Sequence, residues 1–159
     1  MIGMRELLSV LHEKWETDRK ELLERADVVI LHLAKEQHRG AKDKNQLPDK
    51  AVRMYQRAFD RINGGFGGAP KFPAPHNLLF LLSFYEKYHD ESCLSMAELT
   101  LMQMYRGGIF DHIGGGFSRY STDEYFLVPH FEKMLYDNAL LTLAYCRAHA
   151  LTKDKRWAE

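Results

Sequence analysis

The residues of this sequence that could do chemistry are concentrated between Gly107 and Asn138, in the stretch GGIFDHIGGGFSRYSTDEYFLVPHFEKMLYDN. Acids, bases and aromatic residues are mixed there with glycines, and glycine-shaped loops that lead into helices are common places for polar pockets. We therefore predict a polar pocket in this stretch. Its candidate members are Asp111, His112, Arg119, Tyr120, Asp123, His130, Glu132, Lys133, Tyr136 and Asp137.

The types of these residues suggest which of them would take part in catalysis and which would bind a ligand. Histidines and carboxylates can transfer protons. The candidate catalytic residues are therefore His130, Glu132, Asp111 and Asp123. Cationic and aromatic side chains can hold a hydroxyl-rich or anionic ligand. The candidate ligand-binding residues are His112, Arg119, Tyr120, Lys133, Tyr136 and Asp137.

A structural interpretation of the same residues stays open beside the functional one. Arg119 and Glu132 would then form a buried ion pair that braces two loops. His130 would cap a helix and be satisfied by the backbone.

Phosphate-loop and metal chemistry find little support in the sequence. The triple glycine at 114–116 lacks both the GxxxxGK[ST] pattern and a preceding strand. His112 and His130 with Asp111 could ligate a metal, but no HExxH or comparable spacing accompanies them. We therefore expect neither a metal site nor a cofactor.

Three further residues are expected to be structural. Cys93 and Cys146 fall on predicted helices without a pattern of basic neighbours, which favours inert buried thiols. Lys71, between Pro70 and Phe72, is expected to be a solvated or ion-paired lysine of a loop.

Composition restricts the class of protein. At 159 residues the chain is one domain or a piece of a larger one. Lys plus Arg equals Asp plus Glu at 22 each, which argues against a nucleic-acid partner. Apolar runs are too short for a membrane span, and the two cysteines form neither a CxxC pair nor a disulfide framework. We expect a cytoplasmic protein that does not contact membranes.

Apolar periodicity predicts the helices that must position the candidate residues. A long amphipathic helix is predicted from Met4 to Gln37, and a second begins near Pro48. A third follows Pro75, a fourth spans about Ser92 to Arg106, and a fifth starts near Pro129. On this fifth helix His130, Lys133 and Asp137 would share one face, and Glu132 and Tyr136 another.

These elements predict an all-α fold of helical hairpins joined by Gly-Gly-aromatic loops, with no convincing strand. Residues 1–38 are expected to form a long first helix or linker, and residues 48–159 a partial hairpin domain. Stacked hairpins need neighbours to bury their second faces. We therefore expect part of a toroid, with exposed apolar faces that favour self-association.

Three motifs resemble signatures of one protein family. They are GGFGGAPKFP at 64–73, GGIFDHIGGGFSRYS at 107–121 and PHFEKMLYDNA at 129–139. The chain is thereby similar, from about Arg5 to Thr152, to thioredoxin-domain-containing proteins related to spermatogenesis-associated protein 20. Phe126 stands where this family is expected to have tryptophan.

The resemblance implies an N-terminal thioredoxin-like domain followed by an (α/α) toroid similar to N-acylglucosamine 2-epimerases and six-hairpin glycosidases. This sequence has no CxxC motif, so it would correspond to the start of the toroid without the thioredoxin-like domain. The implied partners are that domain, the remaining toroid helices and a sugar or sugar derivative.

Two classes of function follow from these expectations. The first is part of a carbohydrate-active domain, inactive by itself, with the chemistry of an epimerase or isomerase or of a glycosidase. An epimerase would use a histidine base, whereas a glycosidase would use two carboxylates about 5–9.5 Å apart. The alternative is a non-catalytic binding or scaffold module that accompanies a thioredoxin-like domain.

Overall fold

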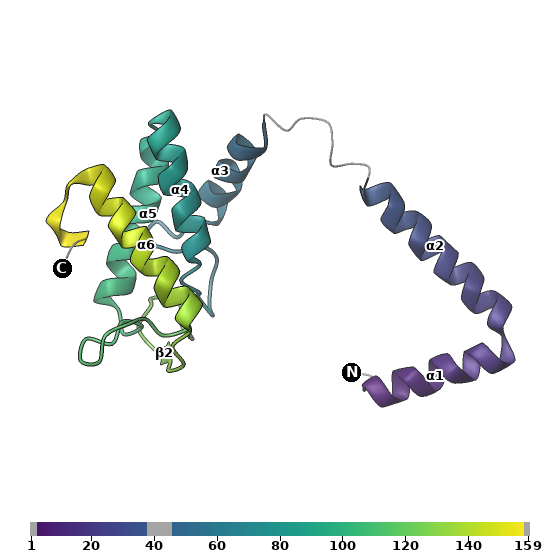
Figure 1. Cartoon of the computed structure of the whole chain (residues 1–159). Helices are drawn as coiled ribbons and strands as arrows, with labels where there is room; N and C mark the ends of the chain where they lie inside the picture. Colours follow the sequence, from purple (N-terminus) through teal and green to yellow (C-terminus); the bar gives the residue numbers. More distant parts are fainter. Residues whose placement is uncertain (1–2, 38–45, 158–159) are drawn as a thin grey trace. The chain divides into compact units, whose positions relative to one another are not determined.

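The structure is a computed structural model that describes residues 3–37 and 46–157 (Figure 1). The chain divides into two compact units, residues 1–45 and residues 46–159. No helix within the described ranges combines the length and the apolar character that crossing a membrane requires.

The first unit contains two helices, α1 (Met4–Thr17) and α2 (Arg19–Gln37). The prediction of one helix from Met4 to Gln37 is therefore wrong at Asp18, whose backbone leaves the helical region at φ −146° and ψ 56°. The Asp18 carboxylate accepts a hydrogen bond from the Glu21 N–H at 3.2 Å, so this residue starts α2 as an N-cap.

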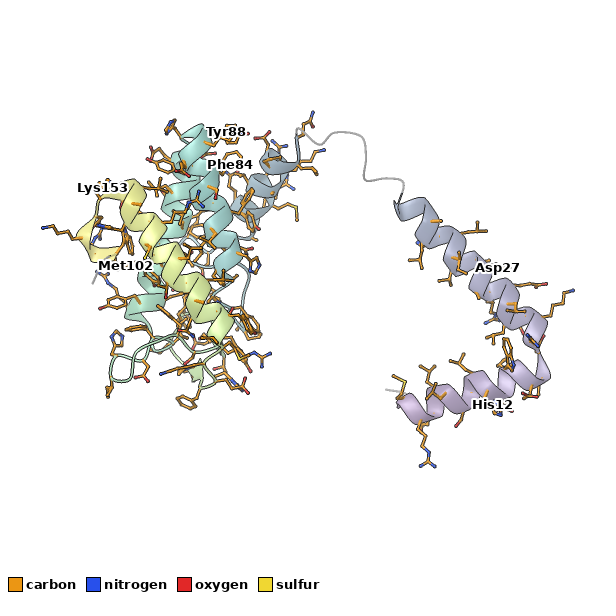
Figure 2. The ribbon with its side chains drawn as sticks, in the orientation of Figure 1. His12, Asp27, Phe84, Tyr88, Met102 and Lys153 are labelled. Atoms are coloured by element: carbon orange, nitrogen blue, oxygen red, sulfur yellow. The ribbon has the colours of Figure 1, made fainter. Side chains whose placement is uncertain are left out.

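Neither helix of the first unit has a fully buried side chain among its described residues. Side chains extend from α1 and α2 in many directions, His12 and Asp27 among them (Figure 2). The apolar positions that the 3.6-residue period predicts are exposed. They include Leu8, Leu11, Trp15, Val29 and Leu33.

The second unit is built around α4 (Pro75–Tyr88), which packs against both α5 (Glu91–Arg106) and α6 (Leu135–Thr152) (Figure 1). Helix α3 (Leu47–Ala58) precedes them and the short 3-10 helix η3 (Lys155–Trp157) follows. The core lies where the apolar faces of these helices meet. Its fully buried members include Leu78, Leu81, Leu82, Leu101 and Leu141.

Short and long connections alternate between the helices of the second unit. Two residues, His89 and Asp90, join α4 to α5, and the Asp90 carboxylate caps α5 by accepting from the Ser92 N–H at 2.9 Å. The long connections, 59–74 and 107–134, therefore both lie at the opposite end of the hairpin. The prediction of an all-α fold made of helical hairpins is confirmed.

The connection 107–134 differs from the prediction in its second half. Two short strands pair there in antiparallel fashion, β1 (Tyr120–Ser121) and β2 (Pro129–His130), with Tyr120 opposite His130. Because Pro129 and His130 are extended, the prediction of a helix from Pro129 is wrong, and α6 begins at Leu135. The predicted helix faces that would join His130 to Lys133 and Glu132 to Tyr136 therefore do not exist.

Candidate functional site

The two long connections are joined at Lys71, five residues after the Gly64-Gly65-Phe66 motif of the first one. The Lys71 N–H donates to the Ser121 carbonyl, and the Ser121 N–H donates to the Lys71 carbonyl, both at 2.8 Å. The Lys71 side chain is completely buried. Its Nζ contacts Asp60 Oδ2 at 2.8 Å and the Gly64 carbonyl at 2.9 Å. Of the two alternatives predicted for Lys71, the structure shows the ion-paired lysine; its side chain is not solvated.

Asp60 is the anion that makes this burial possible. Its carboxylate also accepts hydrogen bonds from the Ile62 and Asn63 backbone N–H groups, each at 2.9 Å. Burial acts to raise the pKa of Asp60, but these N–H groups and the Lys71 ammonium outweigh it and hold the pKa well below its usual range. The ion pair of Asp60 and Lys71 therefore anchors the buried part of the two long connections.

Three neighbouring rings of the two long connections form a group that we call the aromatic stack: Phe72, Tyr120 and His130. Tyr120 and His130 are stacked, with centroids 4.7 Å apart and planes inclined by 21°. Phe72 is tilted against Tyr120 by 36°, with centroids 4.9 Å apart. Pairing of β1 with β2 sets Tyr120 directly opposite His130. Phe72 is 48% exposed, so the stack is open to solvent. Tyr120 and His130 were predicted for the site, whereas Phe72 was missed.

An ion pair lies next to the aromatic stack. Arg119 Nη1 contacts Glu132 Oε2 at 3.0 Å, and the Arg119 N–H donates to the Glu132 carbonyl at 2.7 Å. The predicted bracing pair is present, but its side chains are 44% and 53% exposed, so the prediction that it is buried is wrong. Two loops are joined here by a surface pair.

His130 occupies an unusual position beside this pair. Its Nδ1 lies 3.8 Å from Glu132 Oε2, which is too long for a hydrogen bond. That nitrogen is buried and has no hydrogen-bond partner among the described residues. The prediction that His130 caps a helix is wrong, because His130 belongs to β2.

Asp137, in the first turn of α6, is the candidate carboxylate whose pKa is raised. Burial is the cause, and electrostatic interactions with His76 and Arg119 act in the opposite direction. Both side chains therefore lie within electrostatic range of Asp137. His76 was not predicted for the site, since it lies in the first turn of α4, far from the motif-rich stretch.

Asp111, His112 and Lys133 form a separate group around the triple-glycine turn. Lys133 Nζ contacts Asp111 Oδ2 at 2.6 Å and the Gly115 carbonyl at 2.7 Å. The Lys133 ammonium, together with the Gly114 and Ile113 N–H groups, holds the pKa of Asp111 well below its usual range. The His112 ring meets Phe110 edge-on at 5.0 Å. These groups line a shallow cavity of about 580 Å³.

Asp123 organises the turn between the two strands. Its carboxylate accepts from the backbone N–H groups of Tyr125 and Val128, each at 2.6 Å, and of Leu127 at 3.2 Å. Partial burial acts to raise the pKa of Asp123, but these N–H groups lower it on balance. Phe126, enclosed by this turn, is fully buried with a positive φ of 59°. Tyr136 is exposed in the first turn of α6.

The predicted site residues thus fall into four places: the aromatic stack with its neighbouring ion pair, the triple-glycine turn, the Asp123 turn, and the first turn of α6 with Tyr136 and Asp137. No three His, Cys, Asp or Glu side chains of the described ranges come together in a way that could hold a metal ion.

The cysteines differ from each other. Cys93 is fully buried, and burial, with the nearby Asp90 charge, raises its pKa to about 11. Cys146 is exposed, so the prediction of two buried thiols is wrong for that residue.

Comparison with known sequences identifies homologues along the whole chain. Spermatogenesis-associated protein 20 of Rattus norvegicus is 37% identical over 169 aligned positions, and that of Homo sapiens 38%. Both alignments cover 99% of this chain, which spans 21% of either relative. An uncharacterised protein of Caenorhabditis elegans is 37% identical over 98% of this chain and 22% of its own length. No family model matches the sequence.

Solved structures with a similar fold are sugar epimerases. The cellobiose 2-epimerase from Spirochaeta thermophila DSM 6192 superposes with a TM-score of 0.62 at 22% identity, over 70% of this chain and 30% of that one. A sugar epimerase from a ruminal bacterium gives a TM-score of 0.58 at 19% identity, over 67% and 30%. At such identities the likeness concerns the fold, and it confirms the prediction of part of an (α/α) toroid. The chain is thus similar along nearly its whole length to spermatogenesis-associated protein 20, and it spans about a fifth of the length of the relatives it matches.

Proposed function

We propose that this chain contributes a carbohydrate-binding surface to an epimerase-like toroid, and that the aromatic stack is the centre of that surface. Exposed rings offer an apolar face against which the C–H face of a sugar ring can pack, while nearby charged groups bind its hydroxyls. The observation that carries the proposal is the Phe72–Tyr120–His130 stack beside the Arg119–Glu132 pair. The toroid fold of sugar epimerases supports the same ligand class.

Within a complete toroid, His130 would transfer the proton. Histidine is a common general base, and the His130 side chain is 40% exposed within the aromatic stack. An epimerase needs a base that removes a proton from the sugar carbon next to the carbonyl and a group that returns one to its other face. Glu132 Oε2, 3.8 Å from the buried His130 Nδ1, would act on the ring through its charge and not through a hydrogen bond. Catalysis would require toroid helices beyond this chain, so the chain alone would bind without turnover.

The electrostatics of the candidate catalytic carboxylates favour this chemistry over that of a glycosidase, although burial raises the pKa of Asp137, one of the predicted ligand-binding residues. A glycosidase needs one carboxylic acid that stays protonated, with a raised pKa, opposite a second carboxylate. Asp111 and Glu132 instead pair with different cations, Lys133 and Arg119. The pKa values of Asp111 and Asp123 are lowered. These two acids are therefore better suited to anchoring loops than to donating protons.

A panel of sugars and sugar phosphates, screened by thermal shift on a full-length family member that carries this sequence, tests the proposal. We expect at least one sugar to raise Tm in a saturable way, and Tyr120→Ala to abolish the rise. Tyr88→Ala is the matched control, because Tyr88 is 52% exposed at the far end of α4 (Figure 2). Absence of any shift, or equal loss in both variants, would contradict the proposal.

A non-catalytic scaffold is the second candidate, and the loop-anchoring contacts of Asp123 and Asp111 favour it. In that case His130→Ala and Glu132→Ala would lower Tm and leave sugar affinity unchanged. If either variant keeps its Tm but loses turnover or sugar binding, the scaffold interpretation fails.

A further inference from the structure

A cavity of about 460 Å³ lies among α5, α6 and η3, in a part of the second unit that the proposed sugar surface does not use. Five aromatic rings line it: Tyr105, Phe110, Phe117, Tyr145 and Trp157. The Phe117 and Tyr145 rings are stacked on each other at 5.6 Å with planes inclined by 17°. Cavities of this size with largely apolar walls are typical of small-molecule sites.

Trp157 forms part of the wall of this cavity. The residue is only 6% exposed, and its Nε1 is closed off from solvent without a hydrogen-bond partner within the described residues. The ring of Trp157, and not its N–H group, therefore lines the cavity. Two of the three hydroxyls of the lining are engaged, because Tyr145 donates to the Leu101 carbonyl at 2.7 Å and Thr142 to the Asn138 carbonyl at 2.9 Å. The third, that of Tyr105, has no hydrogen-bond partner within the described residues.

The charges at the cavity favour an anionic ligand. Arg156 is neutralised by Asp154, whose Oδ2 lies 2.8 Å from its Nε, and Glu98 is the other acid that influences it. Arg106 lines the cavity from the end of α5 and is exposed. Over the described ranges of the chain it has neither an ion-pair nor a hydrogen-bond partner. An anion at the mouth would therefore meet a free guanidinium.

We propose that this cavity binds a flat apolar molecule that carries a carboxylate or sulfonate group. The rings of the ligand pack between the aromatic walls, one of which is Trp157, and the anionic group accepts from the Arg106 guanidinium. The matched probes are 2-naphthoate and 2-naphthamide, which share one ring system and differ in charge.

The indole N–H signals give a direct test, because the chain has only two tryptophans. Trp15 is the internal control: it lies in α1, outside this unit, with Arg19 over its ring at 4.1 Å. In a ¹⁵N-labelled chain, with the two signals assigned from Trp15→Phe, 2-naphthoate should shift the Trp157 indole signal saturably and leave the Trp15 signal in place. The neutral amide should bind about fivefold more weakly, a difference expected of one exposed charge pair.

Arg106→Gln should remove the difference between the two probes, whereas Arg53→Gln, an equal loss of charge on α3, should preserve it. Cys146 adds an independent readout, since it lines the cavity while Cys93 is fully buried. Bound 2-naphthoate should slow the alkylation of Cys146 by N-ethylmaleimide at least threefold. An unmoved Trp157 signal, an unchanged alkylation rate, or equal shifts of both indole signals would overturn the proposal.

Discussion

The charge of Lys71 lies in the interior of the second unit, where an isolated ammonium would be strongly disfavoured. Asp60 and the Gly64 carbonyl provide its acceptors, and the Phe126 ring lies 5.3 Å from Nζ. Because Lys71 also exchanges two backbone hydrogen bonds with Ser121, its side chain and its backbone join the same loops. The strength of the Lys71–Asp60 ion pair should therefore determine how firmly the two long connections are held together.

Asp60→Asn should destabilise the second unit by about 3–5 kcal/mol, because it leaves the buried Lys71 charge without its anion. Urea unfolding followed by the signal of the helices would measure the change. Asp49→Asn, at an exposed position in the first turn of α3, is the control and should cost less than about 1 kcal/mol. Equal effects of the two substitutions would show that the Lys71–Asp60 pair is unimportant.

The same carboxylate predicts a pH dependence of stability. The pKa of Asp60 is lower in the folded state than the value of about 3.9 expected for an unfolded chain. Its contribution is therefore complete above that value and decreases as the pH falls toward the folded pKa. The difference in unfolding free energy between wild type and Asp60→Asn should be constant from pH 7 to 5 and shrink below about pH 4. A difference that persists unchanged at pH 3 would contradict this assignment.

Single residues also show where prediction from sequence succeeds. The Arg119–Glu132 pair was predicted because both residues belong to the motif-rich stretch, only 13 positions apart. Phe72 and His76 were missed, since they come from the other long connection and the start of α4. Their approach depends on the pairing of Lys71 with Ser121, which no local pattern reveals.

At the scale of the elements, the loop 59–74 is held against α5 by close backbone contact. The Gly65 N–H donates to the Thr100 hydroxyl at 2.9 Å. A Cβ at Gly64 would lie 2.9 Å from the Thr100 Cα, and the φ of Gly64 is +69°. Glycine is needed here for both reasons.

Gly64→Ala should therefore destabilise the second unit by at least ~1–2 kcal/mol, the cost of the left-handed backbone alone. Gly68→Ala is the matched control in the same loop, because a Cβ there meets nothing within 4 Å and its φ is not positive. Thermal unfolding of the two variants, followed by circular dichroism, would measure the difference. If both variants melt together, the close approach of the loop to α5 does not matter.

The ends of the elements were predictable where a local signal exists. Pro48 correctly indicated the first turn of α3, and the glycines after Arg106 marked the end of α5. The start of α6 was not predictable from Pro129, because proline also suits an edge strand. Pairing of Pro129 with Ser121 extends the backbone and moves the helix start to Leu135. That shift separates His130 from Asp137, so the predicted arrangement of the site on one helix face fails.

At the scale of the whole molecule, large apolar side chains remain on the surface of both units. In the first unit they follow α1 and α2, and in the second they include Ile113, Phe131, Leu135 and Leu143. Exposed apolar area of this extent usually marks an interface. The all-α class and the hairpin plan were predictable from periodicity, whereas no local pattern indicates which surface would pack against these faces.

We therefore expect the chain to self-associate as its concentration rises. Multi-angle light scattering across a concentration series should show a mean mass above that of the 18.5 kDa monomer. Leu8→Glu in α1 should lower that mass, while Glu6→Gln in the same helix should not. A monomer at every concentration would refute the expectation.

The most direct test of the central claim is a titration of this 159-residue chain with cellobiose, N-acetylglucosamine and mannose, followed through the ring signals of its aromatic side chains. If the aromatic stack binds sugar rings, the Tyr120 and His130 signals should move together and saturably for at least one sugar, while those of Tyr88 stay in place. Tyr120→Ala should abolish the response of His130. If the His130 ring remains unaffected by every sugar, or responds equally without Tyr120, the aromatic stack is not a carbohydrate-binding surface.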